Sequence, residues 1–117
     1  MCHLYRLKRI DRANPQGKII MRENQIISAI KAYLKTIPNC YSYKTHGGFY
    51  GSAGLPDIIC CIGGAFIAFE VKTDSGKTTA LQEACIRRIR EAGGTAEVVR
   101  CASDVRAIVE KLAGGKR

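Results

Sequence analysis

The sequence predicts a single α/β domain whose elements follow in the order α-β-β-β-α-β-α. Apolar residues recur at three- and four-residue steps in three segments, which is the period of a helix with one buried face. Two apolar runs of strand length flank Gly63-Gly64, and a third short run separates the last two helical segments. A chain of 117 residues has room for one domain but not for two.

The chain begins with a basic segment, residues 1–18, that has no sustained helical period. Its cationic residues surround Asn14-Pro15 and Gly17, and they are Arg6, Lys8, Arg9, Arg12 and Lys18. This composition suits a DNA-contacting arm and a solvated tail equally well. We therefore expect a basic arm over residues 1–18 and a folded domain over residues 19–117.

The first helix is expected from about Glu23, with Ile27, Ile30 and Leu34 on its buried face, and Pro38-Asn39 ends it. Residues 40–45 alternate tyrosine with small or polar residues, which is typical of a strand. Four glycines in the nine residues 46–54 then indicate a loop.

A β-hairpin is predicted next, with strands over residues 58–62 and 65–71, because Gly63-Gly64 suits the positive φ angles of a two-residue turn. The second helix covers residues 79–92 and stops at Gly93-Gly94. A short strand over residues 96–101 follows, and then a last helix capped by Ser103 that runs up to Gly114-Gly115.

Charge and composition narrow the possible functions. Nineteen Lys and Arg residues against ten Asp and Glu give a net charge of +9, which favours nucleic acid as a partner. With 46% hydrophobic and 25% charged residues, the chain has the composition of a globular protein. No apolar run is long enough for a membrane helix, so we expect a soluble, cytoplasmic protein without a membrane partner.

The six cysteines are expected to be free, buried thiols, because they are scattered through apolar segments and no signal peptide precedes them. A zinc site is disfavoured, since the chain has two histidines and no CxxC pair.

Three charged residues of the hairpin point to chemistry. Glu70 and Lys72 are two apart on one strand and therefore emerge on the same face, and the hairpin register brings Asp57 close to Glu70. Two carboxylates this close need a cation between them, and Mg²⁺ or Mn²⁺ is the hard ion that oxygen ligands favour. Lys72 would then position or deprotonate a water molecule. The alternative is an ordinary strand end whose charges face solvent.

Glu23 is a further candidate, because it lies on the same helical face as Ile27, Ile30 and Leu34. A carboxylate at the edge of a buried stripe suggests a partner inside the fold. An acidic residue that interacts with the dipole at the N-terminus of its helix is the equally good alternative.

These motifs together resemble a known group of enzymes. Gly54-Leu55-Pro56-Asp57, then Glu70-Val71-Lys72, then Leu81-Gln82 on the next helix are similar to the PD-(D/E)xK nuclease superfamily. They resemble more closely the stand-alone VRR-NUC nucleases of bacteriophages and prophages, over roughly residues 21–109. The resemblance implies the αβββαβα restriction-endonuclease-like core, in which helices flank a central mixed sheet.

The resemblance also implies roles for individual residues. Asp57 and Glu70 would be the principal metal ligands, the carbonyl of Val71 a further ligand, Lys72 the catalytic lysine, and Glu23 and Gln82 the supporting acid and glutamine. It implies Mg²⁺- or Mn²⁺-dependent endonuclease activity on structured or branched DNA, such as Holliday junctions or flaps. A homodimer would cut such a substrate symmetrically, in the host cytoplasm if a phage encodes the protein.

Several other residues are candidates for contacting DNA, namely Lys44, His46, Lys77, Arg87 and Arg88. Tyr41, Tyr43 and Tyr50 are candidates for base stacking, although tyrosines in strands and loops more often pack within the fold. All of these residues would suit a solvated surface as well. The competing function is a non-catalytic, basic nucleic-acid-binding module, for which the charge and the basic arm suffice.

Overall fold

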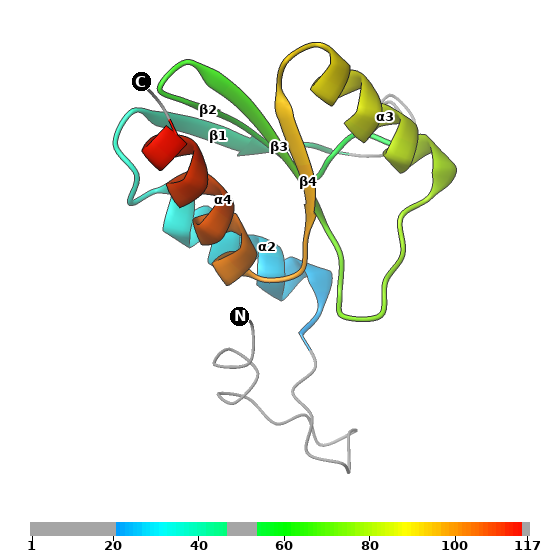
Figure 1. Ribbon diagram of the computed structural model, residues 1–117. Helices are drawn as coiled ribbons and strands as arrows, with labels where there is room; N and C mark the ends of the chain where they lie inside the picture. Colours follow the sequence, from blue (N-terminus) through cyan, green and yellow to red (C-terminus); the bar gives the residue numbers. More distant parts are fainter. Residues whose placement is uncertain (1–20, 47–53, 116–117) are drawn as a thin grey trace.

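The structure is a computed structural model that describes residues 21–46 and 54–115, so the predicted basic arm and most of the glycine-rich loop lie outside the described residues. Within these ranges the elements follow the predicted order (Figure 1). The helices are α2 (Glu23–Leu34), α3 (Ala80–Glu91) and α4 (Ala102–Gly115). The strands are β1 (Cys40–Lys44), β2 (Ile58–Ile62), β3 (Ala65–Val71) and β4 (Thr95–Val99).

The strands form one mixed sheet in the order β1-β2-β3-β4. β1 and β2 are antiparallel, as are β2 and β3, whereas β3 and β4 are parallel and are connected through α3. The predicted hairpin is confirmed: Gly63 and Gly64 have φ angles of 56° and 88°, and Ile62 pairs with Ala65. The α/β class and the predicted mixed sheet flanked by helices are therefore confirmed.

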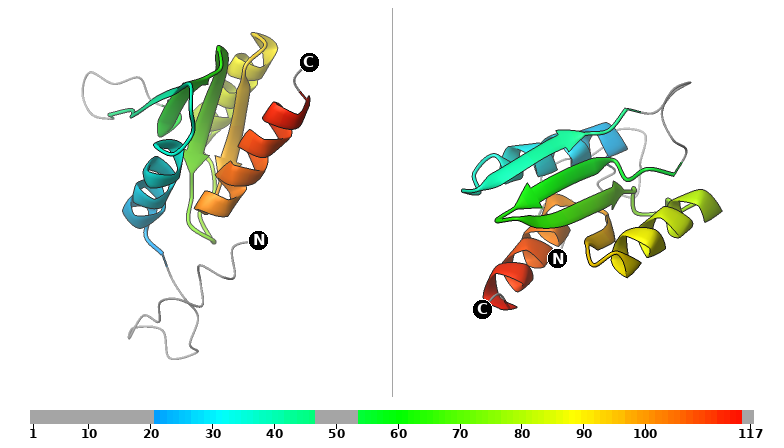
Figure 2. Two further views of the ribbon diagram at one scale, coloured as in Figure 1. Left: turned by 90° about the vertical axis from the view of Figure 1, so that its left-hand side faces the viewer. Right: turned by 90° about the horizontal axis from the view of Figure 1, so that it is seen from above.

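Helices cover the two faces of the sheet unequally. α2 and α4 pack on one face over the main hydrophobic core, which includes Ile30, Phe69 and Val105 (Figures 1 and 2). α3 packs on the other face against the parallel pair, where Ile86 meets Ala68 and Ala96. Because residues alternate along β3, Phe69 and Val71 enter the main core while Glu70 points to the α3 side.

Some boundaries differ from the sequence expectation. α2 ends at Leu34 rather than at Pro38, because Thr36 and Ile37 donate to the carbonyls of Tyr33 and Leu34 in tighter turns. α4 begins at Ala102, so Ser103 lies inside the helix and is not its cap. At the start of α4, the side chain of Asp104 accepts a hydrogen bond from the backbone N–H of Arg100 (2.8 Å).

Four cysteines are free thiols as expected, at Cys40, Cys60, Cys61 and Cys85, but only Cys60 among them is buried and Cys61 is exposed. The expectation is wrong for Cys101, which is disulfide-bonded. Within the described part of the chain, no helix combines the length and the apolar character needed to cross a membrane.

The core residue Phe69 offers a test of the packing. Its side chain is fully buried between β2 and the helices α2 and α4, so Phe69→Ala should lower the free energy of unfolding by about 3–5 kcal/mol. Phe66 on the same strand is 45% exposed, and Phe66→Ala should cost much less. Urea denaturation of both variants measures this difference, and equal losses would contradict the described packing.

Candidate active site

The site is built on the antiparallel pairing of β2 with β3. Ile58 pairs with Phe69, and continuing this register by one residue sets Asp57 opposite Glu70. Glu70 and Lys72 project on the α3 side of the sheet, and Lys72 Nζ lies 3.6 Å from Glu70 Oε2. The sequence analysis expected this approach of the three side chains, and the structure brings them together.

The carboxyl group of Glu70 is almost completely buried from solvent. Only 2% of its surface is exposed, and Lys72 beside it is 12% exposed. Glu70 Oε2 accepts a hydrogen bond from Gln82 Nε2 (2.9 Å), whereas Glu70 Oε1 is buried without a hydrogen-bond partner among the described residues. A buried carboxylate oxygen without a partner is costly, so this position favours a ligand with positive charge.

The pKa of Glu70 is raised from its ordinary value near 4.5 to about 7, and burial is the largest cause. The negative charge and hydrogen bonding of Asp57 contribute to this rise, and the positive charge and hydrogen bonding of Lys72 only partly offset it. The carboxyl group therefore takes up a proton near neutral pH when no cation is bound, and a bound cation would favour its ionised form.

Asp57 is held by backbone contacts from two directions. Its Oδ2 accepts the N–H of Val71 (2.8 Å), and its carbonyl accepts the N–H of Thr45 (2.9 Å). The hydroxyl of Thr45 also donates to the carbonyl of Pro56 (2.7 Å). Thr45 therefore anchors the segment that carries Asp57 to the end of β1, a role that the sequence analysis missed.

The N-terminus of α3 positions Gln82. Thr79 and Gln82 form a capping box, in which the Thr79 hydroxyl accepts the N–H of Gln82 and Gln82 Oε1 accepts the N–H of Thr79. With its oxygen used in this way, the Gln82 side chain presents its NH₂ group to Glu70. The Thr-x-x-Gln spacing is the sequence signal for this arrangement, and it went unused in the sequence analysis.

Gly54 fits closely against the same helix. A Cβ atom at this position would lie 2.6 Å from the carbonyl oxygen of Leu81, and the φ angle of Gly54 is +88°. The absence of a side chain therefore lets the segment leading to Asp57 lie directly against the first turn of α3. Asp57 and Gln82 are thus fixed to each other through backbone packing.

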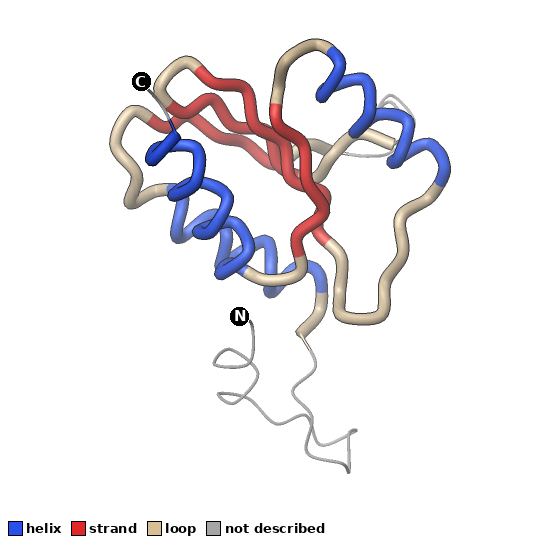
Figure 3. The backbone as a smooth tube through the Cα atoms, in the orientation of Figure 1, coloured by secondary structure: helices blue, strands red, loops and turns tan. Residues whose placement is uncertain are grey.

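Arg100 organises the long connection between β3 and α3, which Figure 3 shows as a loop at the end of the sheet. Its Nη1 donates to the carbonyls of Thr73, Asp74 (3.4 Å) and Gly76 (2.9 Å). The loop that follows Lys72 is therefore tied to the end of β4. A lone arginine after a short strand gave no sequence signal for this role.

The other predicted site residues lie apart from this cluster. Glu23 is exposed in the first turn of α2. Within residues 21–46 and 54–115, Asp57 and Glu70 interact instead with each other and with Val71, Lys72 and Gln82. The side chain of Lys44 lies on the α2 face of the sheet, because its partner Ile58 belongs to the main core. The remaining candidates are exposed, and they are His46, Lys77, Arg87 and Arg88.

The donor set suits a hard divalent cation. Asp57 and Glu70 supply carboxylate oxygens, and Glu70 Oε1 is the buried oxygen that lacks a partner. Among the described residues, no group of three or more His, Cys, Asp and Glu side chains is placed to hold a metal. A bound ion would therefore need a backbone carbonyl, water or a phosphate oxygen to complete its coordination.

The raised pKa of Glu70 predicts how stability depends on pH. Because the folded-state pKa lies above the ordinary value, the stabilisation by protonated Glu70 is present below pH 4.5 and is lost as the pH rises through about 7. In EDTA, the wild type should therefore lose stability relative to Glu70→Gln as the pH rises from about 4.5 to about 7, by up to ~1.4 kcal/mol per pH unit, and the difference should level off above that range. Urea denaturation of both proteins measures this, and parallel pH profiles would refute it.

The close approach of Gly54 to α3 predicts a second effect. Gly54→Ala should destabilise the protein by about 2–4 kcal/mol, because the new methyl group overlaps the Leu81 carbonyl and the φ angle is unfavourable. Gly64→Ala is the matched control, since Gly64 has the same φ angle of +88° but no atom within 4 Å of its Cβ position. Equal losses of unfolding free energy in both variants would show that the contact with Leu81 is unimportant.

The fold was compared with those of known proteins. No family model and no curated protein matches the sequence significantly. A solved structure described as "VRR_NUC domain protein" superposes with a TM-score of 0.66 and 18% identity, covering 78% of this chain and 87% of the other. Another, described as "VRR_NUC domain", gives a TM-score of 0.61 and 22% identity, covering 81% and 97%. This chain therefore has the fold of VRR-NUC domains.

Proposed function

We propose that this protein is a metal-dependent endodeoxyribonuclease. The observation that carries the proposal is the buried carboxyl group of Glu70 opposite the partly buried Asp57, with Lys72 and Gln82 in contact with Glu70. The fold shared with VRR-NUC domains supports the same conclusion, since the name of those domains denotes nucleases. The net charge of +9 suits a polyanionic substrate.

Burial argues against an incidental acidic cluster. Charges at a solvated strand end would be exposed, whereas Glu70 is 2% exposed and points towards a second carboxylate. A buried carboxylate destabilises a fold unless it binds a ligand or has a permanent partner of opposite charge. A non-catalytic binding module has no need for this arrangement, and the nuclease is therefore the better explanation.

The residues divide the work as follows. Asp57 and Glu70 would hold Mg²⁺ or Mn²⁺, with the carbonyl of Val71 as a further ligand, and the ion would supply Lewis-acid activation of the phosphate and of water. The ammonium group of Lys72 would stabilise the negative charge that develops on the phosphate during the reaction. Gln82 fixes the orientation of Glu70 through its hydrogen bond (2.9 Å). Gln82 would also position the attacking water or a phosphate, the role that the resemblance to the nuclease family implies.

The finer features of the activity are also proposals. We propose structured or branched DNA as the substrate, a homodimer as the active form, and the cytoplasm as the location. The nuclease domain would comprise residues 19–117, with the basic arm of residues 1–18 as an additional contact to DNA. Lys77, Arg87 and Arg88 would contact the phosphate backbone, as would Lys44 and His46, whereas Glu23 is exposed on α2 outside the cluster and has no part in the proposed site.

A cleavage assay tests the proposal. End-labelled single-stranded, duplex, flap and four-way-junction DNA is incubated with the protein in Mg²⁺, Mn²⁺ or EDTA. We expect products only with a divalent metal, and a loss of at least about 100-fold in rate for Asp57→Ala, Glu70→Gln and Lys72→Ala.

Lys111→Ala is the control, because Lys111 is an exposed lysine on α4 outside the cluster, and it should cleave like the wild type. Circular dichroism confirms that each variant is folded. Binding of DNA without cleavage in any metal, unchanged in the variants, would show that the protein is a binding module instead.

A further inference from the structure

One face of the sheet is left open beside the acidic cluster. Tyr43 pairs with Ile59, and Ile59 pairs with Ala68, which packs on α3. Partners across strands share a face, so Tyr43 lies on the same side as Glu70. This row is two residues along β2 from Asp57, a distance of roughly 7 Å. The row beyond it joins Tyr41, Cys61 and Phe66.

Aromatic side chains are exposed on this open face. Tyr41 is 71% exposed, Tyr43 is 51% exposed and Phe66 is 45% exposed. The rings of Tyr41 and Tyr43 are neighbours, with centroids 6.2 Å apart and planes tilted by 56°. Seen from above in Figure 2, β1 and β2 lie in front of α2, while α3 lies beside β3. No described helix therefore covers the two tyrosines.

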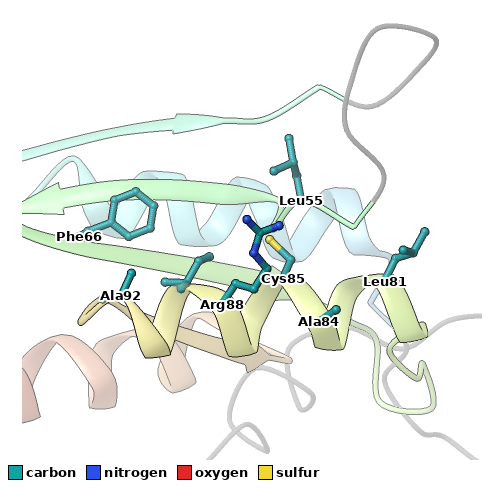
Figure 4. Close-up of a pocket in the computed structure, with 9 residues that line it drawn as sticks. Leu55, Phe66, Leu81, Ala84, Cys85, Arg88 and Ala92 are labelled. Carbon is teal, nitrogen blue, oxygen red and sulfur yellow. The ribbon is translucent and has the colours of Figure 1, made fainter.

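A groove continues this surface towards α3. It has a volume of about 600 Å³ and lies between Phe66 on β3 and the side chains of Leu81, Cys85 and Arg88 on α3 (Figure 4). Arg88 brings an exposed cation to a groove whose other walls are mostly apolar. Exposed aromatic rings beside a groove that carries a cation are an arrangement that accepts bases on one part and phosphate on the other.

We propose that this face binds unpaired nucleotides of the DNA substrate, with bases stacked on Tyr41, Tyr43 and Phe66 and a phosphate at Arg88. The inference rests on the proposed nuclease function and specifies its substrate as DNA with a single-stranded segment next to the cut. Three observations favour this occupant: the surface adjoins the Asp57–Glu70 pair, a cation lies in the groove, and the net charge is +9.

Binding measured in EDTA tests the proposal without requiring cleavage. A fluorescent duplex with a six-nucleotide thymidine tail is compared with a blunt duplex of equal length. We expect the wild type to bind the tailed duplex about ten-fold more tightly. The double variant Tyr41→Ala/Tyr43→Ala should lose this preference while its affinity for the blunt duplex changes less than about two-fold.

The variant Tyr41→Phe/Tyr43→Phe is the matched control, because it keeps the rings and should keep the preference. Arg88→Ala should reduce the salt dependence of binding by about one phosphate contact, whereas the tyrosine variants should leave it unchanged. Urea denaturation confirms that all variants are folded. A phenylalanine variant that binds as weakly as the alanine variant would overturn base stacking.

Two further outcomes separate this inference from the proposed function. Cleavage by the wild type with equal binding of tailed and blunt duplex would overturn the inference and leave the nuclease intact. Tail-dependent binding that needs the rings, without cleavage in any metal, would support the surface and overturn the nuclease. Sedimentation of the alanine variant is also measured: conversion of a wild-type dimer to monomer would show that the tyrosines form an interface between copies, and would overturn the inference.

Discussion

The antiparallel pairing of β2 with β3 sets the partly buried carboxylate of Asp57 opposite the fully buried carboxyl group of Glu70. Asp57 and Glu70 would repel each other there, and burial makes the repulsion stronger than it would be in solvent. Three neighbouring groups relieve it: the N–H of Val71 on Asp57, and Gln82 and Lys72 on Glu70. One oxygen of Glu70 still lacks a hydrogen-bond partner among the described residues, and this is why we propose that the pair binds a cation.

The rest of the fold holds this pair in place. Thr45 ties the segment before β2 to the end of β1, and Gly54 lets the same segment lie against α3. The capping box at Thr79 fixes the first turn of α3 and with it Gln82. Arg100 secures the loop between β3 and α3 from the end of β4. Residues that flank β1, β2, β4 and α3 thus fix the geometry, which a preorganised site requires.

Uneven covering of the sheet gives the molecule two different faces. α2 and α4 bury one face around Phe69, and α3 covers the other face only over β3 and β4. The uncovered part carries Tyr41 and Tyr43 directly beside the acidic cluster. The proposed nucleotide-binding surface and the proposed active site therefore lie on the same side of one sheet.

The sequence by itself determined the element order, the hairpin and the approach of Asp57 to Glu70, because these depend on local periodicity and on a two-residue turn of fixed register. The sequence prediction misplaced the end of α2 and the cap of α4, because hydrogen bonds in the adjacent turns determine where these helices end and begin. Only the tertiary structure decided the burial of Glu70, the contact of Gly54 with Leu81 and the attachment of the loop to Arg100. These contacts join segments up to 27 residues apart, and their energies depend on packing that no local pattern encodes.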